Sequence, residues 1–168
     1  KNSRSSNSGA IYIVSGNFTL KKSTLKGNVA TGNGAGIFLD NGALTVVNST
    51  ISGNTANGFG GGIYASIITF ASVVIQNSTI AYNSASTGGG ISRANGTYNI
   101  SNTIIANNNA TLSNPDCNGT IATANYSIIE NPTGCVVTNG ANNINADPKI
   151  DSALTGDALV HILLNGSL

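Results

Sequence analysis

Charged side chains are scarce in this chain of 168 residues. Seven Lys and Arg and six Asp and Glu make up 8% of it and give a net charge of +1, whereas charged residues form about a quarter of an ordinary soluble domain. Nothing in this balance favours nucleic acid or an anionic membrane as a partner. The only basic cluster, Lys21, Lys22 and Lys26, is typical of a solvated turn.

Long hydrophobic runs are also missing. The longest candidate, Ile67 to Ile75, is interrupted by Thr69 and Ser72, and a membrane span needs about twenty apolar residues. We therefore expect no membrane insertion. No signal peptide is visible at Lys1, which is compatible with a mature product whose leader has been removed. Helical spacing with caps is absent as well, so we expect an all-β fold.

Cysteine and histidine are too few for a metal site. The chain has two Cys and one His, and neither Cys117 nor Cys135 has His or acidic neighbours at metal-ligand spacing, so we expect no metal and no cofactor. We expect one disulfide between Cys117 and Cys135, which would place the chain in an oxidising compartment, extracellular or at the cell surface. Two buried free thiols are the alternative.

The acidic residues do not form the clusters that catalysis on a β-helix requires. Lyases and glycosidases of this kind need carboxylates gathered on one face. Here no two acids occupy equivalent positions of the regular repeat, and Asp147-Pro148 is typical of a turn. His161 lies in an apolar run with no nucleophile spaced to it, which favours a structural histidine. We therefore expect no enzymatic activity. The acids are Asp40, Asp116, Glu130, Asp147, Asp151 and Asp157.

What the chain does have is an internal repeat. A glycine-rich motif ending in isoleucine recurs with Ile11, Ile37, Ile63 and Ile91 at spacings of 26, 26 and 28 residues. A Ser-Thr-Ile or Ser-Thr-Leu motif follows the first three copies, and a degenerate Asn-Thr-Ile follows the fourth. Within a unit, apolar residues alternate with polar ones, as in strands. Units of this length must stack to bury their apolar faces. We expect one domain over residues 1–168, a parallel β-helix of about six coils with three short strands per coil, regular over about 8–110 and less regular over about 111–168.

Asparagines recur with the same period. Equivalent polar positions of a solenoid stack into a ladder, in which each amide bonds its copies above and below. A buried amide without partners would cost about 1–3 kcal/mol. We expect a structural ladder at one bend and a shorter, inward-facing one at Asn48 and Asn77. The main ladder is expected to contain Asn28, Asn54, Asn83 and Asn107.

These motifs resemble the right-handed parallel β-helix proteins that bacteria secrete, including polymorphic outer-membrane-protein-like repeats and proteins with a choice-of-anchor Q region. The resemblance covers nearly the whole chain and implies a right-handed coil. It specifies the fold much more strongly than the function. It rests on Gly60 to Tyr64, Asn77 to Ile80, Asn83, Cys117, Asn125 to Ile129, Cys135, Asp147-Pro148 and His161 to Ser167.

Aromatic residues directly follow three of the repeated isoleucines. Strand alternation places Tyr12, Phe38 and Tyr64 outside, one above another. Such a stack is suited to packing against a partner or a neighbouring segment, or to binding a glycan. The threonines Thr24, Thr50, Thr79 and Thr103 are also expected to point outward, but only one threonine per strand recurs, so the two-column array of ice-binding solenoids is missing.

Several Asn-X-Ser/Thr sequons are present. Those expected in turns, Asn95, Asn109 and Asn118, are the candidates for glycosylation in an organism that N-glycosylates.

The last segment is apolar and outside the repeat. Because a solenoid exposes unpaired strand edges at both ends, we expect head-to-tail assembly of copies of this chain into a surface filament or adhesive fibre. The alternatives are a monomer whose C-terminal segment folds back on its own last coil, and a monomeric carbohydrate-binding or adhesin module. The candidate assembly residues are Leu159, Val160, Ile162, Leu163 and Leu164.

Overall fold

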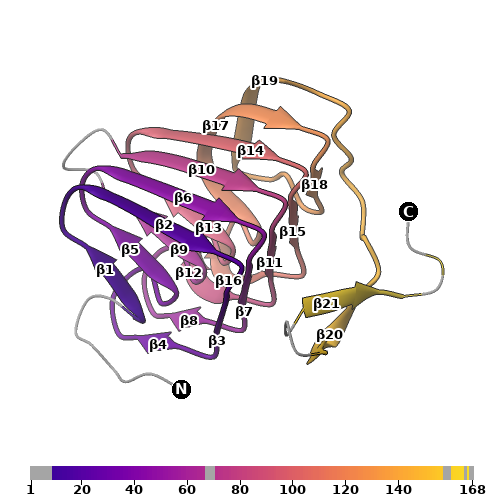
Figure 1. Ribbon diagram of the computed structural model, residues 1–168, viewed down its shortest axis with the longest axis horizontal. Helices are drawn as coiled ribbons and strands as arrows, with labels where there is room; N and C mark the ends of the chain where they lie inside the picture. Colours follow the sequence, from indigo (N-terminus) through magenta and orange to yellow (C-terminus); the bar gives the residue numbers. More distant parts are fainter. Residues whose placement is uncertain (1–8, 67–70, 157–159, 165, 167–168) are drawn as a thin grey trace.

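The chain forms a stack of parallel β-coils (Figure 1). The computed structural model describes residues 9–66, 71–156, 160–164 and 166, and every regular element within these ranges is a strand. Each complete coil contributes one strand to each of four parallel columns, and successive coils pair in register, for example Ile11 with Ile37 and Ile37 with Ile63. The structure is therefore a β-solenoid, as the repeat predicts.

Two of the columns belong to one ten-stranded sheet. The first column contains β1 (Ile11–Ile13), β5 (Ile37–Leu39), β9 (Ile63–Ala65) and β13 (Ile91–Arg93). The second contains β2 (Asn17–Lys21), β6 (Ala43–Val47), β10 (Ser72–Gln76) and β14 (Thr97–Ser101). The long strand β17 (Cys117–Asn125) pairs with both β13 and β14, and β19 (Cys135–Ala141) pairs with β17.

The other two columns are separate sheets. The third contains β3 (Thr24–Lys26), β7 (Thr50–Ser52), β11 (Thr79–Ala81), β15 (Ile104–Ala106) and β18 (Ile128–Ile129). The fourth contains β4 (Val29–Ala30), β8 (Thr55–Ala56), β12 (Ser84–Thr87) and β16 (Asn109–Ser113).

The number of coils and strands differs from the sequence prediction. The described chain has four coils of four strands and two incomplete coils, one with β17 and β18 and one with β19, in place of about six coils of three strands. The fourth strand of the first coils is only two residues long, as in Val29–Ala30, so it carries no alternation to detect. The coil estimate was too high because residues after Ile144 leave the stack and form the antiparallel hairpin of β20 (Ile150–Thr155) and β21 (Val160–Leu163).

The core is the column of alternate side chains inside the coils. Ile37, Ile63, Val73 and Ile80 are fully buried and belong to one continuous hydrophobic cluster. Close approach of the coils explains the glycines before the isoleucines. A Cβ on Gly62 would lie 2.5 Å from the carbonyl oxygen of Gly90 in the next coil, so a side chain there would force the coils apart.

A ladder of buried asparagines runs along the bend between the third and fourth columns. The main-chain N–H of Asn54 and its Nδ2 both donate to Asn83 Oδ1, at 3.0 and 2.9 Å, and Nδ2 also donates to the carbonyl oxygen of Leu25 at 3.1 Å. Asn28 donates to Asn54 in the same way. Each amide thus satisfies turn groups in two neighbouring coils, as predicted.

The fourth member of this ladder is Asn108, and the prediction of Asn107 was wrong. Asn83 donates to Asn108 Oδ1 at 2.9 and 3.0 Å. Matching the threonines in the sequence aligns Thr103 with Thr79, but strand register pairs Thr79 with Ile104. Thr103 therefore lies one position before the place that the sequence alignment gives it. Asn107 instead occupies the left-handed position that Tyr82 holds in the coil before, with φ of 55° and 57° respectively.

Asp116 ends the ladder. Its Oδ1 accepts from Asn108 Nδ2 at 2.9 Å, and its Oδ2 accepts from the main-chain N–H of Asn131 at 2.7 Å. An asparagine could not accept on both sides, because its NH₂ group would face one of these donors. Burial raises the pKa of Asp116 to about 6, and the hydrogen bonds from Asn108 and Asn131 oppose this shift only in part.

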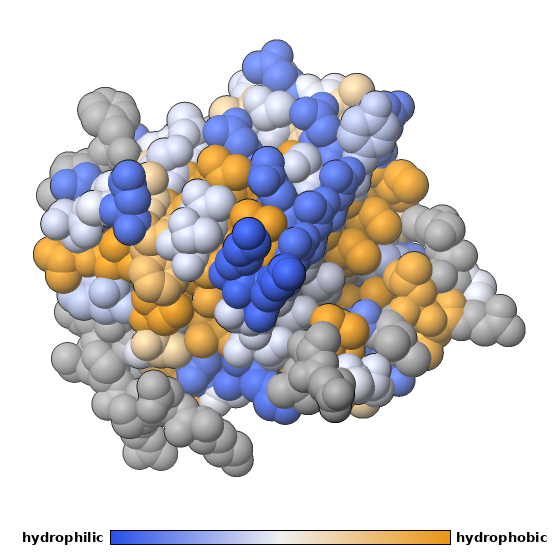
Figure 2. All heavy atoms as spheres, viewed as in Figure 1, coloured by the Kyte–Doolittle hydropathy of each residue, from blue (hydrophilic) through white to orange (hydrophobic). Residues whose placement is uncertain are grey.

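The bend between the second and third columns is built differently. Ser49 and its equivalents form the inward column there, and Ser49 Oγ accepts from the main-chain N–H of Ser23 at 3.2 Å. Asn48 and Asn77 precede this column, are exposed and have a φ of 49°, so the prediction that they face inward was wrong. Short polar side chains tolerate the left-handed conformation that this turn requires. Figure 2 shows the resulting band of hydrophilic side chains where strands β2, β6, β10 and β14 end.

The C-terminal hairpin lies against the outward face of the third column (Figure 1). Ile150 is buried and packs with Ala81 and Ala106, and Tyr82 Oη donates to the carbonyl oxygen of Ile150 at 2.8 Å. The segment therefore folds back on its own solenoid, against its middle coils and not against the last coil. Val160 and Leu163 form strand β21 with β20 as partner, and Leu164 N donates to the carbonyl oxygen of Lys149. Leu159 lies outside the described residues.

Replacing Asn54 with Ala tests the ladder. The substitution leaves the Asn28 donors without their acceptor and the Leu25 carbonyl without a donor, so we expect a loss of at least about 1–3 kcal/mol in the free energy of unfolding. Thr55→Ala is the matched control, because Thr55 is exposed, and it should cost under about 0.5 kcal/mol. Equal denaturant midpoints for the two variants would contradict the assignment.

Asp116 makes stability depend on pH with a defined sign. Its pKa is raised from 3.8 to about 6, so between these values the folded state holds a proton that the unfolded state has released. Stability therefore falls as pH rises from about 4 to about 6, by up to about 3 kcal/mol at 1.36 kcal/mol per pKa unit. Urea unfolding measures the free energy of unfolding at pH 4 and at pH 6. The part of the difference between these two values that comes from Asp116 should be absent in Asp116→Asn. An unchanged difference would show that Asp116 is not the group responsible.

Candidate functional site

The outward face of the first column carries a row of aromatic rings. Strand register places Tyr12, Phe38 and Tyr64 on successive coils. The ring centroids of Tyr12 and Phe38 lie 5.0 Å apart, and those of Phe38 and Tyr64 lie 5.1 Å apart, both with edge-to-face geometry. Tyr12 is 52% exposed and Tyr64 only 8%. The predicted stack therefore exists, and one of its ends is open to solvent.

A fourth ring, Phe59, extends this row sideways. Phe59 is 43% exposed, and its ring lies nearly parallel to that of Tyr64 at 6.1 Å and 26°. Sequence reasoning missed it because Phe59 lies outside the period-two strands, in an isolated parallel bridge with Thr87 just before Gly60. The sequence did contain one indication of it. An aromatic residue directly precedes the glycine motif of a strand whose ring was already predicted to lie on the outer face. We call Tyr12, Phe38, Tyr64 and Phe59 the aromatic face.

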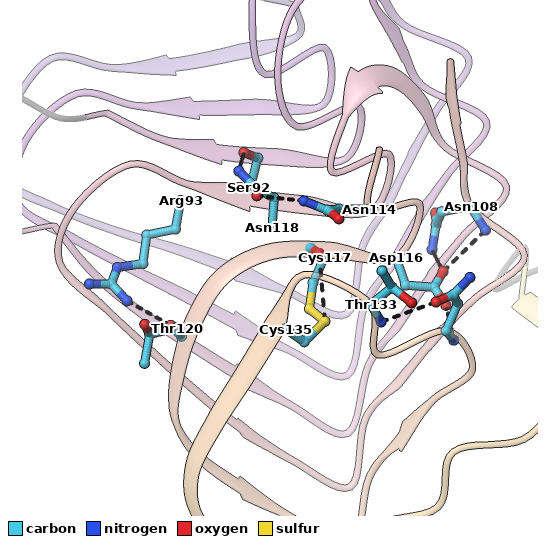
Figure 3. The surroundings of a disulfide bond; sticks show 11 residues. Ser92, Arg93, Asn108, Asn114, Asp116, Cys117, Asn118, Thr120, Thr133 and Cys135 are labelled. Carbon is cyan, nitrogen blue, oxygen red and sulfur yellow. Dashed lines mark hydrogen bonds between the residues drawn. A yellow bond between two sulfur atoms is a disulfide. The ribbon is translucent and has the colours of Figure 1, made fainter. Parts of the chain in front are cut away.

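Beyond Tyr64 the same column becomes polar. Register places Ser92 and then Asn118 next to Tyr64. Asn118 Nδ2 donates to Ser92 Oγ at 3.2 Å, and Asn114 Nδ2 donates to Asn118 Oδ1 at 2.8 Å (Figure 3). A cavity of about 230 Å³ is lined here by Phe59, Tyr64, Ser92, Arg93, Ala94 and Asn118. An aromatic wall thus meets hydroxyl and amide groups in one groove.

Charge around this groove is limited. Burial, and to a lesser extent the Asp40 carboxylate, raise the pKa of the Tyr64 hydroxyl, so it stays a neutral hydrogen-bonding group. Arg93 Nη1 donates to the carbonyl oxygen of Thr120 at 2.9 Å, and its buried Nε has no hydrogen-bond partner among the described residues. Figure 3 shows this side chain directed toward Thr120 and away from Ser92 and Asn118. Arg93 is therefore the charged residue among those that line the groove, and its guanidinium is held toward Thr120.

The predicted disulfide between Cys117 and Cys135 is present (Figure 3). It joins β17 to β19 across 18 residues, with a Cα–Cα distance of 5.5 Å. Cys117 occupies the buried column that the repeated isoleucines fill in earlier coils, and Asn118 is its neighbour. The bond therefore fixes the strand that supplies the polar part of the groove.

The three candidate glycosylation residues differ in environment. Asn109 is exposed on β16, where its side chain can be reached. Asn95 lies in the turn between β13 and β14, and its Oδ1 accepts from Gly96 N at 2.8 Å. Asn118 lies in the groove, where its amide makes the two hydrogen bonds to Ser92 and Asn114 described above.

A second cluster lies under the C-terminal hairpin. His161 Nε2 is 2.7 Å from Ser52 Oγ, and His161 Nδ1 is 2.7 Å from the carbonyl oxygen of Asp151. The Tyr82 ring centroid is 5.0 Å from that of His161. Burial lowers the pKa of His161, and hydrogen bonds to the main chain of Asp151 and Ala153 offset this only in part. Sequence reasoning found no nucleophile near His161, because Ser52 is 109 residues away.

The described ranges contain no group of three or more His, Cys, Asp or Glu positioned to hold a metal ion. Within the same ranges, no helix is long and apolar enough to cross a membrane. Comparison of the chain with protein-family models, curated proteins and solved structures finds no match to any of them.

Proposed function

We propose that this protein is an extracellular carbohydrate-binding module and that the aromatic face with its adjoining groove is the binding surface. The observation that carries the proposal is the continuity of exposed rings with a polar groove on one face. Aromatic rings offer flat apolar surfaces on which the C–H faces of sugar rings pack, while hydroxyl and amide groups bond the sugar hydroxyls.

The exposure of individual rings indicates how a glycan would lie. Tyr12 and Phe59 are the open rings at 52% and 43%, whereas Tyr64 is nearly covered. A sugar unit on the outer face of Phe59 would bring its hydroxyls toward Asn118 in the groove, whose amide keeps a second N–H and a second lone pair beside its bonds to Ser92 and Asn114. The site is held in advance by strands in register and by the disulfide, which lowers the entropic cost of binding.

An extracellular location is part of this proposal. The disulfide supports it, because such bonds persist mainly in oxidising compartments.

Glycan binding is tested by removing the open ring of the groove. The purified protein is screened on a glycan array, and affinity for the best ligand is measured by calorimetry. Phe59→Ala should weaken binding by about 10- to 100-fold, because a stacked ring contributes on the order of 1–3 kcal/mol. Phe59→Tyr should retain most of the affinity. Leu112→Ala, which removes a side chain that is 80% exposed on β16, should change nothing. Failure to bind any glycan, or equal loss in both alanine variants, would overturn the proposal.

Head-to-tail assembly into a filament is the second candidate, and one observation favours it. Within the described chain, β2 and β19 lie at opposite ends of the second column and each pairs on one side only. Strand β19 also exposes Val136 and Val137, at 59% and 40%. An unpaired apolar edge is a template for another strand. This contact does not involve the C-terminal segment predicted for assembly, because β21 already pairs with β20 in its own hairpin.

Filament formation is tested by charging this edge. Val137→Lys should abolish assemblies seen by electron microscopy or sedimentation, since it places a charge in the contact. Thr55→Lys, on the interior strand β8, is the control. A wild-type protein that stays monomeric at high concentration would exclude the filament.

A further inference from the structure

The protonation state of the His161 ring follows from its two contacts. The carbonyl oxygen of Asp151 only accepts hydrogen bonds, so the Nδ1 atom 2.7 Å from it must carry a proton and donate. In a neutral ring the lone pair is then on Nε2, which lies 2.7 Å from Ser52 Oγ. Ser52 therefore donates its hydroxyl proton toward His161. A serine bonded to a base that a third group orients is the arrangement of an activated nucleophile.

A cavity adjoins this pair. It has a volume of about 380 Å³, and its lining includes Ser52, Gly27, Gly53, Tyr82 and Leu154. The two glycines leave space beside Ser52, and Tyr82 and Leu154 supply apolar walls. Ser52 is only 4% exposed, so a substrate would reach its hydroxyl through this cavity.

A positive charge is available for the oxyanion of an acyl-transfer reaction. Lys26 also lines the cavity and is the register partner of Ser52 on the neighbouring strand. The nearby main-chain donors are already used, since Gly53 N donates to Ala81 and Gly27 N donates to Ser52. The Lys26 ammonium is therefore the group suited to stabilise the developing negative charge.

We propose that Ser52 and His161 form a catalytic dyad that hydrolyses small acyl esters, with Lys26 as the oxyanion stabiliser. Ser52 Oγ attacks the ester carbonyl carbon while its proton passes to His161 Nε2. The ester C–O bond breaks, and the leaving alkoxide takes that proton and departs as the alcohol. Water then attacks the acyl-serine and gives a proton to Nε2. The bond from Oγ to the acyl carbon breaks, Oγ regains a proton, and the carboxylic acid leaves.

The position of the pair supports this chemistry at neutral pH. Burial lowers the pKa of His161, so the ring is the neutral base at pH 7. Among the described residues, the titratable groups around it are Tyr82 and Asp151, with Lys26 beside Ser52 in the cavity. Activity should therefore persist below the ordinary titration range of histidine and be lost only at more acidic pH, as the ring takes up a proton.

The test uses an alkyl fluorophosphonate on the whole protein, with the modified residue mapped by mass spectrometry, and hydrolysis of p-nitrophenyl acetate as a second readout. We expect modification of Ser52 and a rate lower by at least about 100-fold in His161→Ala. Lys26→Met retains the serine and the histidine and should slow ester hydrolysis by about tenfold or more. Ser101→Ala, outside the cavity, should leave both rates unchanged.

A purely structural tether is the competing explanation. Because the chain has a single histidine, its tautomer can be read from nitrogen NMR. A ring protonated at Nδ1, with Ser52 unmodified by the fluorophosphonate, would show that the hairpin is docked but the dyad is not catalytic. Modification at equal rates in the wild type and in His161→Ala would also overturn the proposal.

Discussion

Stacking of equivalent polar groups from coil to coil is the constraint on which this structure depends. Parallel coils bury main-chain groups at each bend, and those groups must find partners inside the protein. Asn54 and Asn83 supply them by accepting from one coil and donating to another. This arrangement works only if each coil presents an amide at the same place, which fixes the register of all four strand columns. The ladder then needs an end that only accepts, and Asp116 provides it.

Once register is fixed, the outer surface is organised by column. A single position repeated on successive coils yields a row, so Tyr12, Phe38 and Tyr64 form a row of aromatic rings through strand register alone. Ser92 is the next residue of this row, where the groove begins. The third column shows the opposite use of the same rule. Its outward alanines leave an apolar surface, and the C-terminal hairpin covers it.

Features that repeat were predictable from the sequence, and features that occur once were not. The recurring isoleucines predicted parallel stacking because their spacing can be seen directly in the sequence, without knowledge of contacts between distant residues. The ladder prediction was wrong at Asn107 because coils of 25 and 29 residues shift the sequence alignment by one residue. The fourth strand of the first coils was missed because a two-residue strand shows no alternation of apolar and polar residues. The contact between Ser52 and His161 depends on the path of a non-repetitive segment, which no pattern in the chain specifies.

Amide hydrogen exchange of the ladder asparagines tests the central claim most directly. The main-chain N–H groups of Asn28, Asn54 and Asn83 each donate to a buried amide oxygen of the next coil, and opening any of them requires neighbouring coils to separate. They should exchange among the slowest in the protein, close to the rate set by global unfolding. Exchange as fast as that of the edge strand β19 would show that the ladder does not hold the coils together.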